Sequence, residues 1–407
     1  MLTEERINDF CNQKNYDIRL SGNGRWIDQK CAADVLTVVA DCIMNYGLEH
    51  DDDFFCTRDV WHYTYTVENV EAVFRKPGVE NPNAEHEYDK FFAQPMEMLA
   101  YAGVLNKRKQ GKANFYQIAN YDVLEYIALR ERNALSFLKI YIQKVLNDSG
   151  IYDLFDTFFA RQDKDSYDDV KDGFSQFTIQ YTKINGEVEC NRIFIKVLNP
   201  LAYYYHSRGT EKGRLSEHPI TYDMLMYNRN NFRDVFSNKP KGVTRREYAA
   251  AHPIEINEAY YRYQSAKAKR FLRMFNDQNR QGKTEHMDGI HIFDQAVHMH
   301  HIFPESDYPE ICYYLENLIA LTPTQHLNYA HPNGNTREID EQYQHLLLLS
   351  KADRIKENLT TPTAEKIYEF SNLLYVMNVG FDDDDIHDIL DMDFGSVVNA
   401  INVHYSA

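Results

Sequence analysis

The sequence predicts an α+β fold organised in several domains. The 407 residues, of which 43% are hydrophobic and 26% charged, are enough for two or three domains with substantial cores. Long segments with apolar residues at helical spacing are separated by short apolar runs that end at Pro or Gly, which is typical of a chain that combines helices with small sheets. We expect three parts: residues 1–132, a mixed α/β region over residues 133–255, and residues 256–407, where two short strands and a helix are followed by further helices.

Two features of the sequence exclude other broad classes. No apolar run approaches the roughly 18 residues of a membrane span, and the polar, acidic N-terminus has no signal-peptide core. The six cysteines lie far apart and form no C-x-x-C pair, so we expect buried, reduced thiols rather than a disulfide framework or a zinc knuckle. The sequence therefore predicts a cytoplasmic protein that has no membrane partner.

Residues 28–130 combine helical segments with a basic hairpin. Apolar residues at helical spacing predict a helix over residues 32–46, and a second short helix follows it. A third helix is expected over residues 88–101, where Pro95 should kink or divide it. Two short runs within residues 103–118 flank a polar tip, which predicts a β-hairpin.

This order of elements resembles a winged helix. The resemblance implies that the hairpin is a wing whose basic tip touches the phosphate backbone of DNA. Winged helices also mediate protein contacts, and basic hairpin tips are common on protein surfaces, so both readings stay open. The candidate DNA-binding residues at the tip are Lys107, Arg108, Lys109 and Lys112.

The middle region offers fewer chemical signals. Helical spacing covers residues 135–146 and 152–159, whereas residues 177–182 and 192–198 alternate apolar and polar side chains, which is typical of strands. An acidic, turn-rich segment at residues 163–173 separates the helices from the alternating segments. We interpret this part as scaffold between the two ends of the chain.

The net charge of −17 argues at first against nucleic acid, but its distribution favours such a partner. Residues 205–285 contain 16 Lys and Arg against 9 Asp and Glu, and acidic residues are concentrated elsewhere. This asymmetry suits a DNA-facing surface, although solvation of exposed faces explains the acidic runs equally well. Four basic residues of a helix expected over residues 256–278 could guide a DNA backbone: Lys267, Lys269, Arg270 and Arg273.

Within this basic region, Arg and Asn are the side chains that read base edges, and Lys holds phosphates. A solvated basic loop with Asn in its turns is the structural alternative. The candidate DNA-binding residues are Asn228, Arg229, Asn230, Arg233, Lys239, Lys241, Arg245 and Arg246.

Residues 297–331 hold most of the chemistry-bearing side chains. A short strand with a histidine pair stops at Pro304, a polar loop follows, and an apolar run after Asn317 predicts a second strand. Thr322-Pro323 then leads into a helix. This strand, loop, strand and helix would bring several side chains toward one point: His300, His301, Asn317, His326 and His331.

The arrangement resembles the HNH family of ββα-metal nucleases over about residues 286–335. The resemblance implies that His300 and His326 are metal ligands. It also implies that His301 is the general base and that Asn317 holds the His301 loop by hydrogen bonds. The chemistry is consistent, because imidazole is a competent base near neutral pH. Adjacent strand residues point to opposite faces, so the two histidines of the pair cannot both bind one metal.

The last ligand position departs from the family. Colicin-type members place a further ligand four residues after the helix histidine, on the same helical face, where this chain has Ala330. His331 lies one residue further on and precedes Pro332, which disfavours helical backbone. His331 could curl back to the metal or simply end the helix. Asn328 and a water molecule are the other candidates for that position.

The resemblance implies a metal-dependent DNA endonuclease that uses a divalent metal, with Mg²⁺ expected and Mn²⁺ or another transition metal as alternatives. Large, non-repetitive regions favour a sequence-specific type II restriction enzyme that cuts double-stranded DNA as a homodimer. We expect no nucleotide cofactor, because Gly282-Lys283-Thr284 lacks the rest of a P-loop. The alternatives are a modification-dependent or other phage-defence nuclease and, in a different class, a non-catalytic DNA-binding regulator. Chance clustering among the 16 histidines is the structural alternative.

Overall fold

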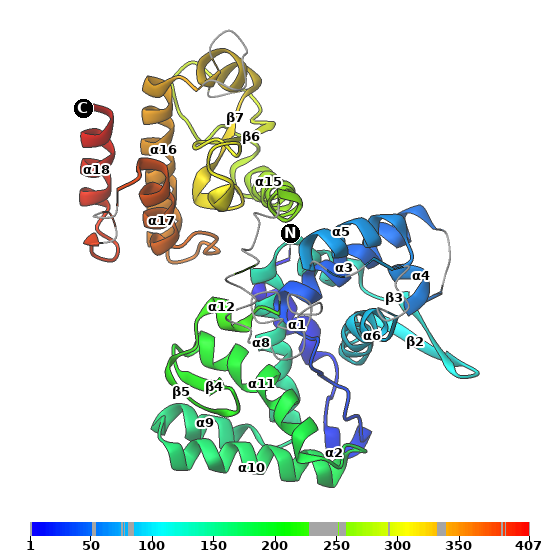
Figure 1. Cartoon of the computed structure of the whole chain (residues 1–407). Coiled ribbons are helices and arrows are strands. Elements are labelled where there is room, and N and C mark those ends of the chain that lie inside the picture. The colour runs from blue at the N-terminus through cyan, green and yellow to red at the C-terminus, as the bar shows by residue number, and fades with distance from the viewer. Residues whose placement is uncertain are drawn as a thin grey trace. The chain divides into compact units, whose positions relative to one another are not determined.

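The computed structural model describes residues 2–50, 54–74, 76, 78–79, 85–227, 251, 258–291, 294–331, 339–383, 386 and 388–406. Over these residues the chain is mostly helical with small antiparallel sheets, so the α+β class is confirmed (Figure 1). The chain divides into two compact units, residues 2–255 and residues 256–407. Across the described residues, no helix combines the length and the apolar character that a membrane span requires.

The N-terminal unit begins with helices and a three-stranded antiparallel sheet. The strand order is β1-β3-β2, with Arg108 opposite Phe115 in the expected hairpin. The hairpin turns at Gly111, whose φ of 62° suits a residue without a Cβ. Pro95 lies inside α6 and does not divide it. The elements are α1 (Glu4–Asn12), α2 (Ile18–Ser21), α3 (Ala33–Glu49), β1 (Phe55–Cys56), α4 (Thr57–Trp61), α5 (Thr64–Phe74), α6 (Glu85–Ala102), β2 (Leu105–Gln110), β3 (Ala113–Ile118) and α7 (Tyr121–Leu129).

The rest of this unit is a helical body with a second hairpin. Helix α8 packs against α1, α3, α7 and α11, so the first two expected domains share one core. Its helical face buries Phe137, Tyr141 and Leu138 among other apolar residues. The elements are α8 (Glu131–Asp148), α9 (Tyr152–Arg161), α10 (Lys164–Tyr181), α11 (Glu187–Tyr204), β4 (Arg208–Glu211), β5 (Arg214–Pro219) and α12 (Tyr222–Leu225).

The expectation of strands at residues 177–182 and 192–198 is wrong, because both segments are helical. Residues 177–181 belong to α10 and residues 192–198 to α11. A short window can alternate by chance along a helix, and the longer pattern decides: the apolar residues that α10 buries recur every three or four positions. The acidic stretch expected as a turn is the first half of α10. The Asp163 side chain caps that helix and accepts a hydrogen bond from the Ser166 N–H at 2.8 Å.

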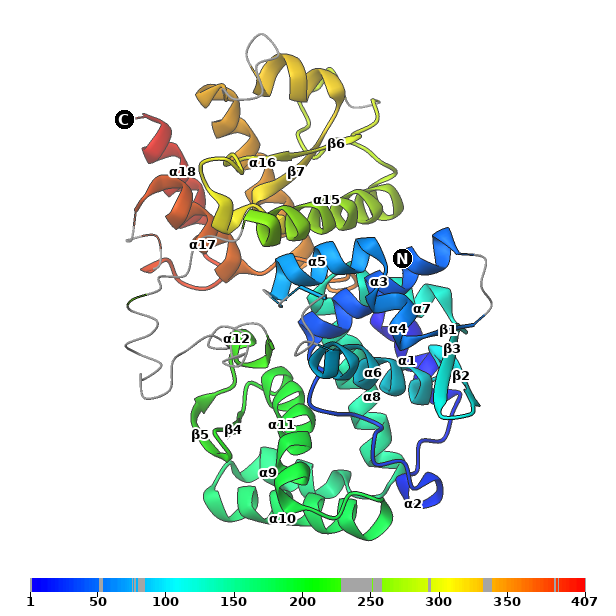
Figure 2. The ribbon, with the colours of Figure 1, turned by 45° about the vertical axis from the view of Figure 1, so that its right-hand side comes forward.

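The C-terminal unit places a two-stranded antiparallel sheet against helices. Strand β6 pairs with β7 so that His300 lies opposite Ile319. Figure 2 shows α15 running beside this pair, and α15 contacts both strands. The elements are α15 (Glu258–Arg280), β6 (His298–His301), the 3₁₀ helices η2 (Pro309–Ile311) and η3 (Leu315–Asn317), β7 (Leu318–Leu321), the π-helix η4 (Gln325–Ala330), α16 (Glu341–Thr360), α17 (Phe370–Phe381) and α18 (Phe394–Ser406).

A buried polar cluster fixes β7 to α16. The Glu285 carboxylate accepts the backbone N–H of Ala320 at 2.8 Å and lies 3.5 Å from the Lys351 ammonium. Lys351 also donates to the Tyr368 hydroxyl at 2.7 Å. Burial lowers the pKa of Lys351, and the charge of Glu285 opposes that shift. The pairing keeps two buried charges compensated, as buried charges require, and it holds the strand that leads into η4.

Candidate metal centre

Successive side chains of β6 point to opposite faces of the strand, so its three histidines lie on two faces. His298 and His300 share one face of the strand, and His301 takes the other. His300 is 4% exposed, whereas His298 is half-buried. The histidine pair therefore serves two different environments, as the sequence predicts.

The π-helix η4 explains the unusual spacing of the last two histidines. A π-helix closes hydrogen bonds between residues five apart, instead of the four of an α-helix. His326 lies in η4 and His331 is its C-cap, with an extended backbone at φ −118° and ψ 99°. The two imidazole rings come to 4.8 Å between centroids. A spacing of five residues thus places the second histidine beside the first, whereas Asn328 is exposed on the same turn.

Three imidazoles gather at this point. One nitrogen from each of His300, His326 and His331 can be chosen so that all lie within 4.8 Å of one another. His300 and His331 are buried, at 4% and 5% exposure. His300 Nε2 and His326 Nδ1 are buried and have no hydrogen-bond partner among the described residues. Buried polar atoms normally have partners, so these two nitrogens are candidate ligand atoms for a cation.

The protonation states suit metal ligation. Burial lowers the pKa of His300 well below its usual value, and the neighbouring imidazoles of His326 and His331 add to the effect. Burial, followed by the charge of His331, lowers the pKa of His326 to about 4. Both rings are therefore neutral at neutral pH, which is the form that binds a metal. The cluster fits a divalent cation with three nitrogen ligands.

Comparison of the chain with known protein families, with curated proteins and with solved structures found no match. The assignment of the site therefore rests on its own geometry.

His301 is held on the opposite side of β6. Its Nε2 donates to the Cys312 carbonyl oxygen at 2.9 Å and lies 3.2 Å from the Ser265 hydroxyl of α15. Because a carbonyl oxygen only accepts hydrogen bonds, this contact puts the ring proton on Nε2 and leaves Nδ1 with the lone pair. Nδ1 is 3.8 Å from a Glu305 oxygen, and the side chain is 10% exposed. Burial, followed by the charge of Lys269, lowers the pKa of His301 to about 4.

Asn317 ties the loop between the two strands together. It is fully buried. Its Nδ2 donates to the carbonyl oxygens of Phe303 and Ile311 at 3.0 and 3.2 Å, and its Oδ1 accepts the Phe303 N–H at 2.8 Å. One side chain thus joins the start and the end of the loop whose Cys312 carbonyl orients His301.

Gln325 fixes the start of η4 in the same manner. Its Nε2 donates to the Asp288 carboxylate at 2.8 Å and to the His286 carbonyl oxygen at 3.0 Å. Its Oε1 accepts the Thr284 hydroxyl at 2.6 Å. The next residue is His326, so this network sets where that ring enters the cluster.

Sequence reasoning missed one histidine of the site. The His298 ring lies 4.7 Å from the His326 ring, centroid to centroid. The signal was present, because residues two apart on a strand share a face. Lys269 was assigned only to general DNA guidance, although its ammonium lies 3.7 Å from Glu305 and its charge reaches three of the histidines.

The predicted DNA-binding residues fall into two groups. At the hairpin tip, the Lys107 ammonium pairs with Glu97 at 2.6 Å, and the Arg108 guanidinium covers the Phe54 ring at 3.6 Å. Lys109 and Lys112 are exposed. The second group lies outside the described residues: Asn228, Arg229, Asn230, Arg233, Lys239, Lys241, Arg245 and Arg246.

Proposed function

We propose that the chain is a metal-dependent endonuclease of the HNH type that hydrolyses phosphodiester bonds of double-stranded DNA. The observation that carries the proposal is the convergence of His300, His326 and His331, with unpartnered buried nitrogens on the first two, next to a separately oriented His301. Buried polar atoms without partners are uncommon, and their presence on two rings of one cluster supports a bound cation. The loop clamp by Asn317 completes the arrangement that the HNH resemblance implies.

The geometry supports a role for each residue. A divalent cation bound by the three imidazoles would supply charge neutralisation on the phosphate and the leaving oxygen. His301 is neutral, and its Nδ1 is the atom that can take a proton from the attacking water. The Cys312 carbonyl holds the ring in this tautomer. Glu305, beside Nδ1, is placed to orient that water, and Lys269 adds a positive charge for the substrate phosphate.

The donor set bears on the choice of metal. Imidazole suits zinc, copper, iron and nickel, whereas Mg²⁺ prefers oxygen ligands and water. The cluster found among the described residues contributes three imidazoles and no carboxylate. The expectation of Mg²⁺ stays a prediction, but this donor set favours a transition metal for tight binding.

We further propose a type II restriction enzyme that acts as a homodimer, because two centres are needed to cut both strands together. The hairpin of β2 and β3, with exposed Lys109 and Lys112, supports contact with the DNA backbone. A winged-helix role for this part is consistent with the strand order β1-β3-β2 and with α6 preceding the hairpin.

Plasmid cleavage under a panel of divalent metals tests the proposal. We expect His301→Ala to lower the cleavage rate by about 100- to 10,000-fold while metal binding and DNA binding persist. The matched control is His218→Ala. It replaces an exposed histidine of the other unit and should keep full activity. DNA binding without cleavage under every metal would favour the regulator instead. Run-off sequencing of plasmids from methylating and non-methylating hosts separates a restriction enzyme from a modification-dependent one.

A further inference from the structure

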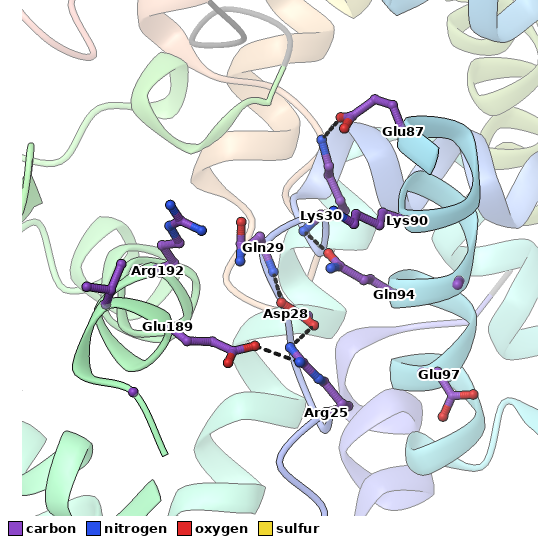
Figure 3. A pocket seen from close by; sticks show the side chains of 13 residues that line it. Arg25, Asp28, Gln29, Lys30, Glu87, Lys90, Gln94, Glu97, Glu189 and Arg192 are labelled. Atoms are coloured by element: carbon purple, nitrogen blue, oxygen red, sulfur yellow. Dashed lines mark hydrogen bonds and ion pairs between the residues drawn. The ribbon is translucent and has the colours of Figure 1, made fainter. Parts of the chain in front are cut away.

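The N-terminal unit contains a cavity of about 720 Å³, and most of its lining residues are charged or carry an amide. It is bounded by residues 25–30, by α6 and by the first turns of α11 (Figure 3). This volume lies within the range of small-molecule sites, about 300–1,000 Å³. Among the described residues, the lining carries four cationic, four acidic and two amide side chains and has no aromatic ring. The cavity belongs to a different unit from the histidine cluster, so it is a separate site.

Each acidic side chain of the lining contacts a cation, and four cations face the four carboxylates. Arg25 spans two carboxylates, with its guanidinium 2.6 Å from Asp28 and 2.6 Å from Glu189. Glu87 contacts both Lys30 and, at 3.6 Å, Lys76. The fourth carboxylate, Glu97, pairs with a lysine of the β2–β3 hairpin at 2.6 Å. These pairs leave the cavity without a free negative charge among the described residues.

Two cations of the lining are left over. Lys90 on α6 and Arg192 on α11 are exposed, and no carboxylate lies within ion-pair distance of either in the described part of the chain. Figure 3 shows them reaching toward the cavity from opposite sides, with Gln29 on the side of Arg192. An anion between them would gain charge-assisted hydrogen bonds from both side chains.

We propose that this cavity binds a phosphate group between Lys90 and Arg192, supplied by a nucleotide-sized ligand or by the DNA backbone. Arg offers a planar fork that matches phosphate geometry, and Lys adds a point charge. The amides of Gln29 and Gln94 provide further hydrogen-bonding groups beside the two charges. The part of the lining that the structure describes offers no aromatic ring for base stacking. Recognition therefore rests on the phosphate.

Titration calorimetry on the full chain, without divalent metal, tests this site. The probes are inorganic phosphate, deoxyadenosine monophosphate and a short DNA duplex. The double variant Lys90→Met/Arg192→Met should bind the relevant probe at least about tenfold more weakly than the original chain. The control Lys164→Met/Lys183→Met removes the same charge from exposed positions of the same unit and should bind normally.

The three probes distinguish the sources of the phosphate. If the double variant loses binding of inorganic phosphate or of the nucleotide while the control variant keeps it, the site binds a free phosphate ligand. Loss of duplex affinity alone, with no binding of the small probes, assigns the phosphate to the DNA backbone. Equal binding of all probes by the double variant and the control overturns the proposal, as does the absence of binding to every probe. Thermal unfolding of each variant verifies that the fold is kept.

Discussion

Lys269 shows how a single residue contributes to the electrostatics of the candidate metal centre. The three imidazoles bring no negative charge, and the Lys269 ammonium lies near enough to lower the pKa values of His300, His301 and His326, after burial and other neighbours. Its ion pair with Glu305 is loose, at 3.7 Å. A metal bound at this candidate site would add to the positive charge, which would suit the polyanionic substrate proposed above.

Replacing Lys269 by Met should therefore have opposite effects on the two ligands. Metal affinity of the protein alone should rise several-fold, because a like charge is removed, whereas KM for DNA should rise because the phosphate loses a cation. Calorimetry and steady-state cleavage measure the two effects. Lys267→Met is the matched control, since that ammonium lies over the Tyr263 ring on the same helix. Weaker metal binding in Lys269→Met would contradict this role.

We expect Asp288 to make the stability of the C-terminal unit depend on pH. Burial raises the pKa of its carboxyl, but hydrogen bonds from the His291 backbone and the Gln325 amide outweigh burial, and the pKa falls well below its usual value. A lowered pKa contributes stability that is present above the unfolded value of about 3.9 and is lost as pH falls through the folded value. Asp288→Asn should therefore destabilise the protein at pH 7, and this difference should shrink below about pH 4. Urea unfolding at several pH values measures it, and a pH-independent difference would count against the argument.

At the scale of elements, the sequence predicts those parts that short-range patterns determine. The β2–β3 hairpin and the β6–β7 pair are recognisable because apolar runs, Gly103 and Pro304 delimit them. The strand expectation within α10 and α11 fails because a short alternating window carries less information than a full helical period. The place of His331 could not be predicted, because a π-helix depends on tertiary contacts such as those of Gln325 that fix its start.

The π-helix η4 gives the element-scale prediction. Inserting an alanine after Asn328 should move His331 off the face of His326 and lower metal affinity by at least about tenfold. Deleting Asn328 shortens the spacing between His326 and His331 to four residues. An α-helix places residues four apart on one face, so metal binding should survive. Titration with Zn²⁺ or Co²⁺ measures both, and Asn328→Ala controls for loss of the side chain. Survival of binding in the insertion variant would show that His331 is not a ligand.

At the scale of the whole molecule, composition gives the net charge, but it does not show which individual charges are paired on the surface. The net charge of −17 says nothing of the local surfaces. The structure shows that the basic residues of the hairpin tip are not equivalent. Glu97 neutralises Lys107, whereas Lys109 and Lys112 face solvent. The sequence predicted the basic tip, but it could not predict which charges are already paired, because Glu97 comes from α6.

This difference predicts how DNA binding responds to salt. Each phosphate contact made by a lysine contributes about one to the slope of log affinity against log salt concentration. Lys109→Ala/Lys112→Ala should therefore reduce the slope for a duplex by about two, whereas Lys107→Ala should change it little, because that charge is already paired with Glu97. Fluorescence anisotropy at several salt concentrations gives the slopes. An equal reduction by Lys107→Ala would mean that the Glu97 pair opens on DNA, and an unchanged slope in the double variant would remove the hairpin from the DNA-binding surface.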